Sequence, residues 1–343
     1  MWNPSFSLLL ACPLLAVVPL TMIAAATVVG AFRAKLDDPK TLAMDLEMIR
    51  SVYDYDVLFP RNDFTLGDVL RYFRATTDLD YWLLEKIVGP GMHTVLTPPV
   101  PGRRSNARQC EFLMPLIRGR VLEVGCGRGF CSMYLAGCFP PTRFVGVDVV
   151  DRHVEVASRM ACDVGYPNVE FQQRDMLQSW EDDDRCFGMI FGVESLCYMD
   201  TEGKRRLFML RTAAKLEEMG RLVIIDGFRS DWFDTAPVDL QVAMCLAERG
   251  FRIRRIPSKS DWIRAAKASG LRLVCDQSLT AEALPFWTLG WRIARSILHT
   301  FPYFSRWLVR ARPETAANLL AVATTAYALR GGVAEYGMLV FRK

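Results

Sequence analysis

From about residue 108 onward, short apolar runs alternate with amphipathic stretches along the chain. Helices are expected after the glycine turn and through Leu135, over about 152–164 and over about 202–217, and a further helix is expected to begin at Ser260. Strands that alternate with helices are typical of a parallel sheet covered by helices on both faces, so we expect an α/β fold. The predicted strands are RVLEVG, RFVGVDVV, NVEFQQRD, CFGMIFGV, GRLVIIDGF, LRLVCD and YGMLVFRK.

The same pattern divides the chain into three parts. Residues 1–32 are apolar, residues 33–107 are mixed and mostly helical, and residues 108–343 contain the alternating pattern. Two stretches of the last part, about 228–258 and 277–333, are longer than ordinary connections. Insertions of this length in an α/β domain usually form lids or binding elements. We therefore expect these insertions, together with the helical segment 33–107, to cover the active site.

The apolar first part predicts a transmembrane anchor over 1–32. Its uncharged stretch over 5–32 is 28 residues long, and as a helix it would measure about 42 Å against a bilayer core of about 30 Å. The alternative is a cleaved signal peptide, because Ala24 to Ala26 could form a cleavage site, although no basic residues precede the apolar stretch. Arg33 and Lys35 favour a membrane-anchored protein with a cytoplasmic catalytic domain.

The second insertion has an unusual composition between residues 287 and 310. Tryptophan, tyrosine and phenylalanine side chains are interleaved with arginines there. This combination suits a helix at a membrane interface. It equally suits a helical cap whose aromatic face lines a substrate pocket, and one element could serve both purposes.

Charge and cysteine usage argue against nucleic acid and metal. The formal net charge of +4 is dispersed without a lysine–arginine block, whereas proteins that bind nucleic acid usually concentrate positive charge. None of the ten cysteines forms a CxxC pair, and the three histidines are scattered. We therefore expect no metal site, and cysteines that behave as small apolar residues in a reducing compartment.

Three glycines at alternate positions, Gly125, Gly127 and Gly129, follow the first predicted strand. In a strand–turn–helix unit, glycines let a ligand approach the backbone at the start of the helix. The spacing is not that of a dinucleotide-binding fingerprint, because Phe130 stands where that fingerprint has its third glycine. Glu123, on the strand before the turn, would repel a pyrophosphate and instead suits a ligand with a positive charge.

The pattern from Glu123 to Gly129 resembles motif I of the class I S-adenosylmethionine-dependent methyltransferases. Asp148 ends the second predicted strand, where the resemblance implies an acidic contact to the ribose hydroxyls. Asp175 follows the third strand, where it implies a contact to the adenine amino group. The cofactor-binding residues that the resemblance implies for S-adenosylmethionine are Glu123, Gly125, Cys126, Gly127, Gly129, Asp148, Val149, Asp175, Met176 and Gly192.

The resemblance covers roughly 108–276 and the terminal strand. It implies a Rossmann-like seven-stranded methyltransferase sheet, here with a helical cap inserted before the last strand. One departure is Met219-Gly220, which stands where the family usually has a Pro-Gly pair.

The candidate catalytic residues are Glu194, Tyr198 and His93. Glu194 and Tyr198 follow the fourth strand in FGVESLCYMD, where the family holds the methionine moiety and the substrate. A carboxylate can take a proton there, and an aromatic face can stabilise a cation. His93 lies where sterol- and tocopherol-type methyltransferases have a segment over the active site. Each of the three could instead be pocket wall or core.

The chain as a whole resembles small-molecule methyltransferases of the sterol, tocopherol and prenyl-lipid type. This resemblance implies methyl transfer to a lipophilic isoprenoid, sterol or quinone-like molecule, most readily at carbon, and the predicted anchor agrees with such a substrate. Two alternatives stay open: N- or O-methylation of a polar natural product, and a noncatalytic binding or scaffold protein with the same fold. The glycine spacing disfavours a nucleotide-binding oxidoreductase.

Overall fold

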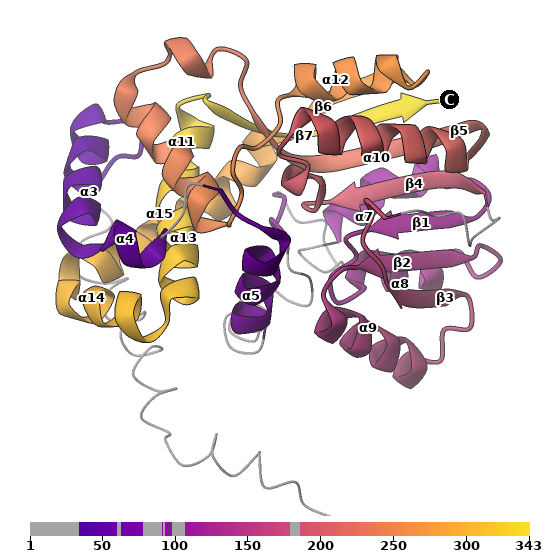
Figure 1. Cartoon of the computed structure of the whole chain (residues 1–343), viewed down its shortest axis with the longest axis horizontal. Coiled ribbons are helices and arrows are strands. Elements are labelled where there is room, and N and C mark those ends of the chain that lie inside the picture. The colour runs from indigo at the N-terminus through magenta and orange to yellow at the C-terminus, as the bar shows by residue number, and fades with distance from the viewer. Residues whose placement is uncertain (1–33, 60–62, 78–90, 92, 98–106, 179–185) are drawn as a thin grey trace, which may run out of the picture.

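A single mixed sheet organises the part of the chain that the computed structural model describes, which is residues 34–59, 63–77, 91, 93–97, 107–178 and 186–343. The strand order is β3-β2-β1-β4-β5-β7-β6 (Figure 1). Neighbours among β1 to β5 are parallel, whereas β7 runs antiparallel to both β5 and β6. The bounds are β1 Val121–Val124, β2 Phe144–Asp148, β3 Val169–Gln173, β4 Phe187–Val193, β5 Leu216–Arg229, β6 Arg272–Ser278 and β7 Ala334–Arg342. The prediction of a Rossmann-like seven-stranded α/β fold is confirmed.

Helices cover both faces of this sheet, and alternate residues of each strand enter two separate cores. Val121 of β1 packs with side chains of α7 and α8, whereas Leu122 packs on the opposite face with side chains of α10 and α12. Because both faces are covered, β1 and β4 are buried along their whole length, which explains their continuous apolar runs. The helices that flank the sheet are α7 Arg108–Leu113, α8 Phe130–Cys138, α9 Asp151–Val164, α10 Glu202–Lys215 and α12 Lys259–Ala268, with short 3-10 turns at η3 Met114–Leu116, η4 Leu196–Tyr198 and η5 Phe233–Thr235.

A group of helices beside the sheet forms what we call the cap (Figure 1). It has its own apolar core. Two of its segments come from the insertions that the sequence indicated, because α11 lies within 228–258 and α13 to α15 lie within 277–333. The cap consists of α3 Pro39–Val52, α4 Tyr55–Leu58, α11 Val238–Gly250, α13 Thr280–Thr300, α14 Pro302–Ala311 and α15 Pro313–Arg330.

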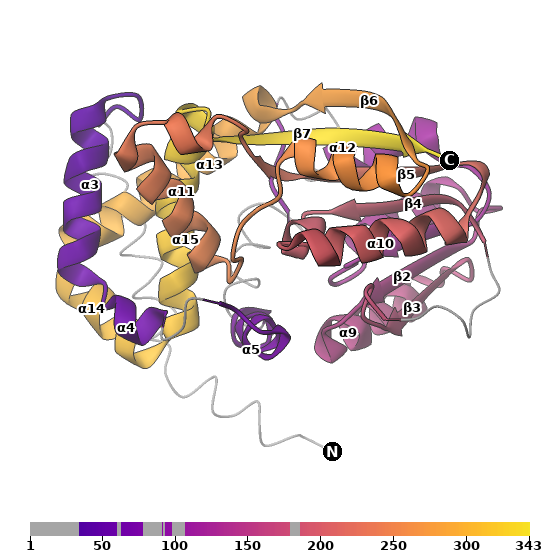
Figure 2. The same cartoon turned by 45° about the horizontal axis from the view of Figure 1, so that its top comes forward.

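Helix α5, Leu66–Thr77, lies between the cap and the sheet in both views (Figures 1 and 2). It contacts each side through a polar pair. The Tyr72 hydroxyl is 3.2 Å from Oδ1 of Asn318 on α15, and Arg74 is 3.2 Å from Asp151 at the start of α9. The segment 33–107 is therefore divided, because α3 and α4 belong to the cap while α5 stands beside the sheet.

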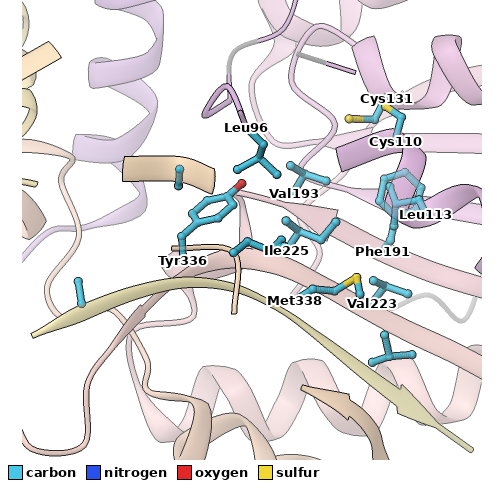
Figure 3. Packing of buried hydrophobic residues seen from close by; sticks show 14 of the residues in the cluster. Leu96, Cys110, Leu113, Cys131, Phe191, Val193, Val223, Ile225, Tyr336 and Met338 are labelled. Carbon is cyan, nitrogen blue, oxygen red and sulfur yellow. The ribbon is translucent and has the colours of Figure 1, made fainter. Parts of the chain in front are cut away.

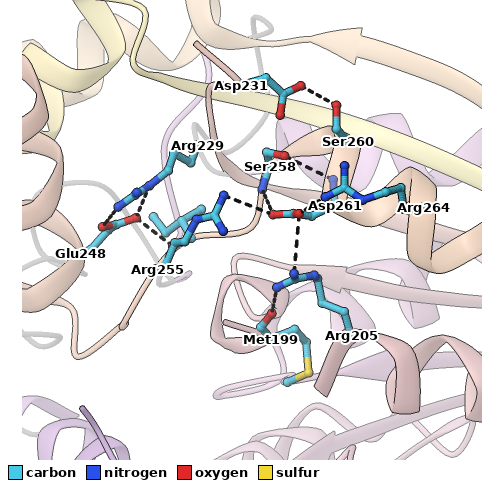
Figure 4. Close-up of polar contacts among 11 residues, drawn as sticks. Met199, Arg205, Arg229, Asp231, Glu248, Arg255, Ser258, Ser260, Asp261 and Arg264 are labelled. Carbon is cyan, nitrogen blue, oxygen red and sulfur yellow. Dashed lines mark hydrogen bonds and ion pairs between the residues drawn. The ribbon is translucent and has the colours of Figure 1, made fainter. Parts of the chain in front are cut away.

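A polar network holds the elements that follow β4 and β5 (Figure 4). Asp261 and Ser258 form a reciprocal capping box at the start of α12. Arg205 of α10 lies 3.6 Å from Asp261 and donates to the Met199 carbonyl at 2.9 Å. Because this bond anchors the backbone directly after η4, the network fixes a turn that borders the cavity described below.

The predicted anchor over 1–32 lies outside the described residues. None of the helices in the described ranges is both long enough and apolar enough to cross a bilayer.

Candidate functional site

A cavity of about 860 Å³ opens at the carboxyl ends of the parallel strands. The turns after β1, β2, β3 and β4 line one part of it, and side chains of α5 and the residues just before it line another. Open α/β sheets bind ligands at this edge, where the strand order reverses on either side of the first strand. Here β1 stands between β2 and β4, so the cavity lies at that switch point.

The turn after β1 brings the backbone close to the cavity. Gly125 has φ +68°, and a Cβ there would lie 2.3 Å from the Cβ of Ser195, which leaves no room for any other residue. Gly127 has φ +52° and no atom within 4 Å of its Cβ position. The alternate glycines therefore have different causes: Gly125 allows β1 and β4 to meet, and Gly127 leaves open space for a ligand.

Glu123 is a buried carboxyl group at the wall of the cavity, with an exposed fraction of 3%. It accepts hydrogen bonds from the Ser132 backbone N–H at 3.0 Å and from the Ser132 hydroxyl at 2.6 Å. Burial raises the pKa of Glu123 to about 8 in spite of these bonds. A cationic ligand nearby would favour the ionised form, so the group suits a ligand with positive charge.

Asp148 ends β2 and connects two neighbouring turns. Its Oδ2 accepts the Gly127 N–H at 2.8 Å, and its Oδ1 accepts the Val150 N–H at 2.8 Å. Asp175 follows β3 and accepts the Leu177 N–H at 2.8 Å. Each carboxylate retains lone pairs for a ligand. Two acidic groups at adjacent strand ends, an open glycine backbone and a buried carboxyl together fit an adenosine cofactor with a cationic amino-acid tail.

The other predicted cofactor residues divide into two groups. Cys126, Val149 and Met176 line the cavity, as do Glu123, Gly125, Gly127, Asp148 and Asp175. Gly129 and Gly192 do not belong to the lining. Gly129 is the N-cap of α8 and packs against Phe171, whereas Gly192 lies within β4 and faces Ser195 and Leu196. These two glycines position the backbone around the cavity.

All three predicted catalytic residues line the same cavity. Glu194 directly follows β4 and has φ +50°, which is unusual for a residue other than glycine. Its Oε1 accepts the Thr94 N–H and the Tyr336 hydroxyl, each at 2.7 Å. Its Oε2 makes no hydrogen bond within the described ranges. One carboxylate oxygen is therefore anchored, and among the described residues nothing competes with a ligand for the other.

Tyr198 and His93 offer their rings. The Tyr198 hydroxyl donates to the Phe251 carbonyl at 2.9 Å, and its ring lies 5.7 Å from that of Phe73. The imidazole of His93 lies 5.6 Å from the ring of Phe130. Since the Tyr198 hydroxyl is occupied by a backbone carbonyl, this residue contributes an aromatic face.

Asp226 of β5 holds the turn that follows β4 through hydrogen bonds to its backbone. It accepts three backbone N–H groups, from Leu196, Cys197 and Gly227, at 2.8–2.9 Å. Burial raises its pKa to about 7, and the negative charge of Glu194 contributes to the same shift. Asp226 thus holds η4 in place beside the catalytic candidates.

Sequence reasoning missed two sets of residues. Leu66, Val69 and Phe73 of α5 line the cavity, and their helical spacing was a usable signal. Thr94 and Tyr336 hold Glu194 but lie 100 and 142 residues away from it in the chain. No local pattern could have indicated these two partners.

Comparison with known proteins agrees with this geometry. A family model described as a methyltransferase domain matches residues 121–216. Among curated proteins, the S-adenosyl-L-methionine-dependent Diels-Alderase iccD of Talaromyces variabilis is 40% identical over 73 residues, which is 20% of this chain and 24% of that protein. The chain thus spans about a quarter of the length of this curated relative.

Solved structures with low sequence identity share the fold. The [4+2]-cyclase SpnF has a TM-score of 0.60 at 18% identity, covering 82% of this chain and 97% of that chain. Geranyl diphosphate C-methyltransferase from Streptomyces coelicolor A3(2), solved with Mg²⁺, geranyl diphosphate and S-adenosyl-L-homocysteine, has a TM-score of 0.58 at 19% identity, covering 80% of this chain and 96% of that chain. The cyclopropane synthase MmaA2 from Mycobacterium tuberculosis has a TM-score of 0.62 at 14% identity, covering 80% of this chain and 98% of that chain. The chain thus contains a region that matches a methyltransferase domain over residues 121–216, and it shares its fold with these solved structures.

Proposed function

We propose that the protein transfers a methyl group from S-adenosylmethionine to a carbon atom of a lipophilic isoprenoid, sterol or quinone-like molecule. The observation that carries this proposal is Glu194. Its carboxylate borders the cavity with one oxygen held by two hydrogen bonds and the other without a partner among the described residues. Methylation of a carbon must be followed by loss of a proton, and this arrangement suits a proton acceptor.

The walls of the cavity support a lipophilic acceptor. Leu66, Val69 and Phe73 present apolar surface from α5. Two cationic side chains that border the cavity already have carboxylate partners: Lys204 lies 2.7 Å from Asp200, and Arg252 lies 2.6 Å from Glu314. Arg128 and Arg174 also border the cavity, so it is the α5 wall that favours an acceptor without a strong charge of its own.

The side chains then have separate roles in the proposed reaction. The cofactor, when bound, supplies an electrophilic methyl group. Glu123, Asp148 and Asp175 would hold the cofactor, and the cavity excludes water from the acceptor. The faces of Phe73 and Tyr198 stabilise positive charge that develops on the acceptor. With the methyl group and the electron pair of the broken carbon–sulfur bond accounted for by the cofactor, Oε2 of Glu194 would take the proton that the methylated carbon releases.

The Glu194→Gln variant tests this function. We expect product formation to fall at least a hundredfold, since general base catalysis typically contributes about 10²- to 10⁴-fold, while the affinity for S-adenosylmethionine stays within about twofold. Incubation with lipid extracts and isotopically labelled cofactor measures the first quantity, and calorimetry measures the second. Glu155→Gln, on the exposed surface of α9, is the matched control. Undiminished methylation by Glu194→Gln would refute the proposed base.

A second candidate function is cyclisation with the cofactor bound. It is favoured by one observation: the curated relative with 40% identity over 73 residues is named as a Diels-Alderase. The mass of the product separates the two functions. Methyl transfer yields a product heavier by one CH₂ group and consumes the cofactor, whereas cyclisation yields an isomer of the substrate and leaves the cofactor intact.

The exposed face of α14 supports delivery of the acceptor from a membrane surface. Tyr303, Arg306, Trp307 and Arg310 recur at the spacing of one helix face, and all four are exposed. Aromatic side chains between arginines suit the headgroup region of an anionic bilayer. We include this contact in the proposal together with the anchor predicted over 1–32.

A further inference from the structure

We propose that Tyr336 is a positioning residue for Glu194, holding one carboxylate oxygen so that the other is directed to the acceptor. Tyr336 lies on β7 and is missing from the sequence-based list of site residues. It does not line the cavity, so it would act through Glu194. The inference deepens the proposed function and rests on it.

The contact comes from β7, the second strand from one edge of the sheet. The ring of Tyr336 is 97% buried and rises from β7, and its hydroxyl lies beside Leu96 and close to Val193 (Figure 3). From there the hydroxyl reaches Oε1 of Glu194 at 2.7 Å. A short hydrogen bond to a charged acceptor is about twice as strong as one between neutral groups.

Gln109 determines the direction in which the Tyr336 hydroxyl points. Its Nε2 donates to the Thr94 carbonyl at 2.5 Å and to the Tyr336 oxygen at 3.3 Å. Because the Tyr336 oxygen accepts this bond, its own proton is free to point at Glu194. Gln109 is fully buried, so water does not compete for either contact.

The same carboxylate oxygen also accepts the Thr94 N–H. Two donors therefore fix Oε1, and Oε2 is the oxygen left for a ligand in the cavity. Burial keeps the pKa of Tyr336 well above its usual value, so the phenol stays a neutral donor over the working range. The titratable groups that surround Glu194 from the neighbouring elements are His93, Cys131, Cys197, Asp226 and Tyr336.

The Tyr336→Phe variant tests this role through the split between kcat and KM. Loss of the hydroxyl leaves Oε1 of Glu194 with the Thr94 N–H as its donor, so the carboxylate is held less firmly in one orientation. We expect kcat to fall about tenfold, while the affinity for S-adenosylmethionine stays within about twofold. An unchanged kcat in a folded Phe variant overturns the inference. An unchanged kcat in Glu194→Gln would instead overturn the proposed base.

A measurement without turnover separates the pair from catalysis. At neutral pH, Tyr336→Phe should lower the unfolding midpoint more in the wild-type background than in the Glu194→Gln background, because the charged bond exists only in the former. Equal losses in both backgrounds would show that the two side chains do not interact through charge, and would overturn the inference. This double-mutant cycle stands whether or not the acceptor has been identified.

Discussion

Glu123 is a buried acid that the fold keeps protonated at neutral pH in the absence of a cation. Its two hydrogen bonds come from one residue, Ser132, and they do not compensate for burial. The pKa of about 8 therefore lies above the value of 4.5 that the unfolded chain would show. Such a difference makes the stability of the protein depend on pH.

The expected sign follows from proton counts. Between about pH 4.5 and pH 8, the unfolded chain has released the proton of Glu123 and the folded chain still holds it. Stability from this group is thus present at low pH and falls as pH rises, by at most about 1.4 kcal/mol per pH unit. Urea unfolding across this window should show a shallower decline for Glu123→Gln than for the wild type. The exposed Glu170→Gln should keep the wild-type slope, and a Glu123→Gln slope equal to it would contradict the assignment.

At the residue scale, the sequence could predict what strand ends and turns impose locally. Glu123, Asp148 and Asp175 border the cavity, as their places at or near the ends of successive strands indicated. The partners of Glu194 could not be predicted in this way. Tyr336 approaches it because β4 and β7 lie on either side of β5, and strand order is a property of the whole sheet. Thr94 approaches it from a segment outside any helix or strand, whose carbonyl is held by Gln109.

Among the elements, α3 depends on one buried carboxylate for its place in the cap. Asp45 accepts hydrogen bonds from Trp291, Arg295 and His299 of α13 and from Tyr327 of α15, at 2.7–3.2 Å. Burial alone would raise the pKa of Asp45, but these bonds and the charge of Arg295 hold it below its usual value. The contribution of Asp45 to stability is therefore present at neutral pH and is lost only as pH falls below about 3.8.

The Asp45→Asn variant should loosen the cap selectively. It keeps the size of the side chain but leaves the half-buried Arg295 without its anion, which we expect to cost about 2–3 kcal/mol of unfolding free energy. Hydrogen exchange should become faster in α3 and α13 and stay unchanged in α10. The exposed Glu47→Gln on the same helix is the control. Uniform acceleration in all helices would show that the cap is not a separate unit.

Some features of the helices and strands could be predicted from local sequence patterns, and others could not. The alternation of strands and helices predicted the sheet and the helical layers on its two faces, because the hydrophobic pattern of each element is a local property of the sequence. The pattern did not show that β5 begins at Leu216 immediately after α10, ahead of the predicted strand. It also did not show that α5 leaves the other N-terminal helices to line the cavity, because that place depends on contacts with α15 and α9.

For the whole molecule, the outward face of α14 leads to a prediction about orientation on a membrane. Trp307 is 50% exposed and Tyr303 is 79% exposed. With anionic vesicles that contain brominated lipid, we expect bound protein to lose part of its tryptophan fluorescence, and Trp307→Phe should remove a clear part of that quenching. Trp232→Phe, whose indole is 42% exposed elsewhere, should leave the quenching as in the wild type. If the two variants lost the same fraction of their fluorescence, the prediction that α14 lies at the membrane surface would be wrong.

The strand order has a consequence for how the chain folds. Strand β6 joins the sheet only through β7, which follows it in the chain after three helices of the cap. Until β7 arrives, the edge of β5 is open, and β6 has no partner within the described ranges. Closing the sheet therefore requires contacts between distant parts of the chain, which form slowly. Since β7 also places Tyr336 beside Glu194, a folding intermediate that already holds β1 to β5 would contain the turns that line the cavity but not the hydrogen bond between Tyr336 and Glu194.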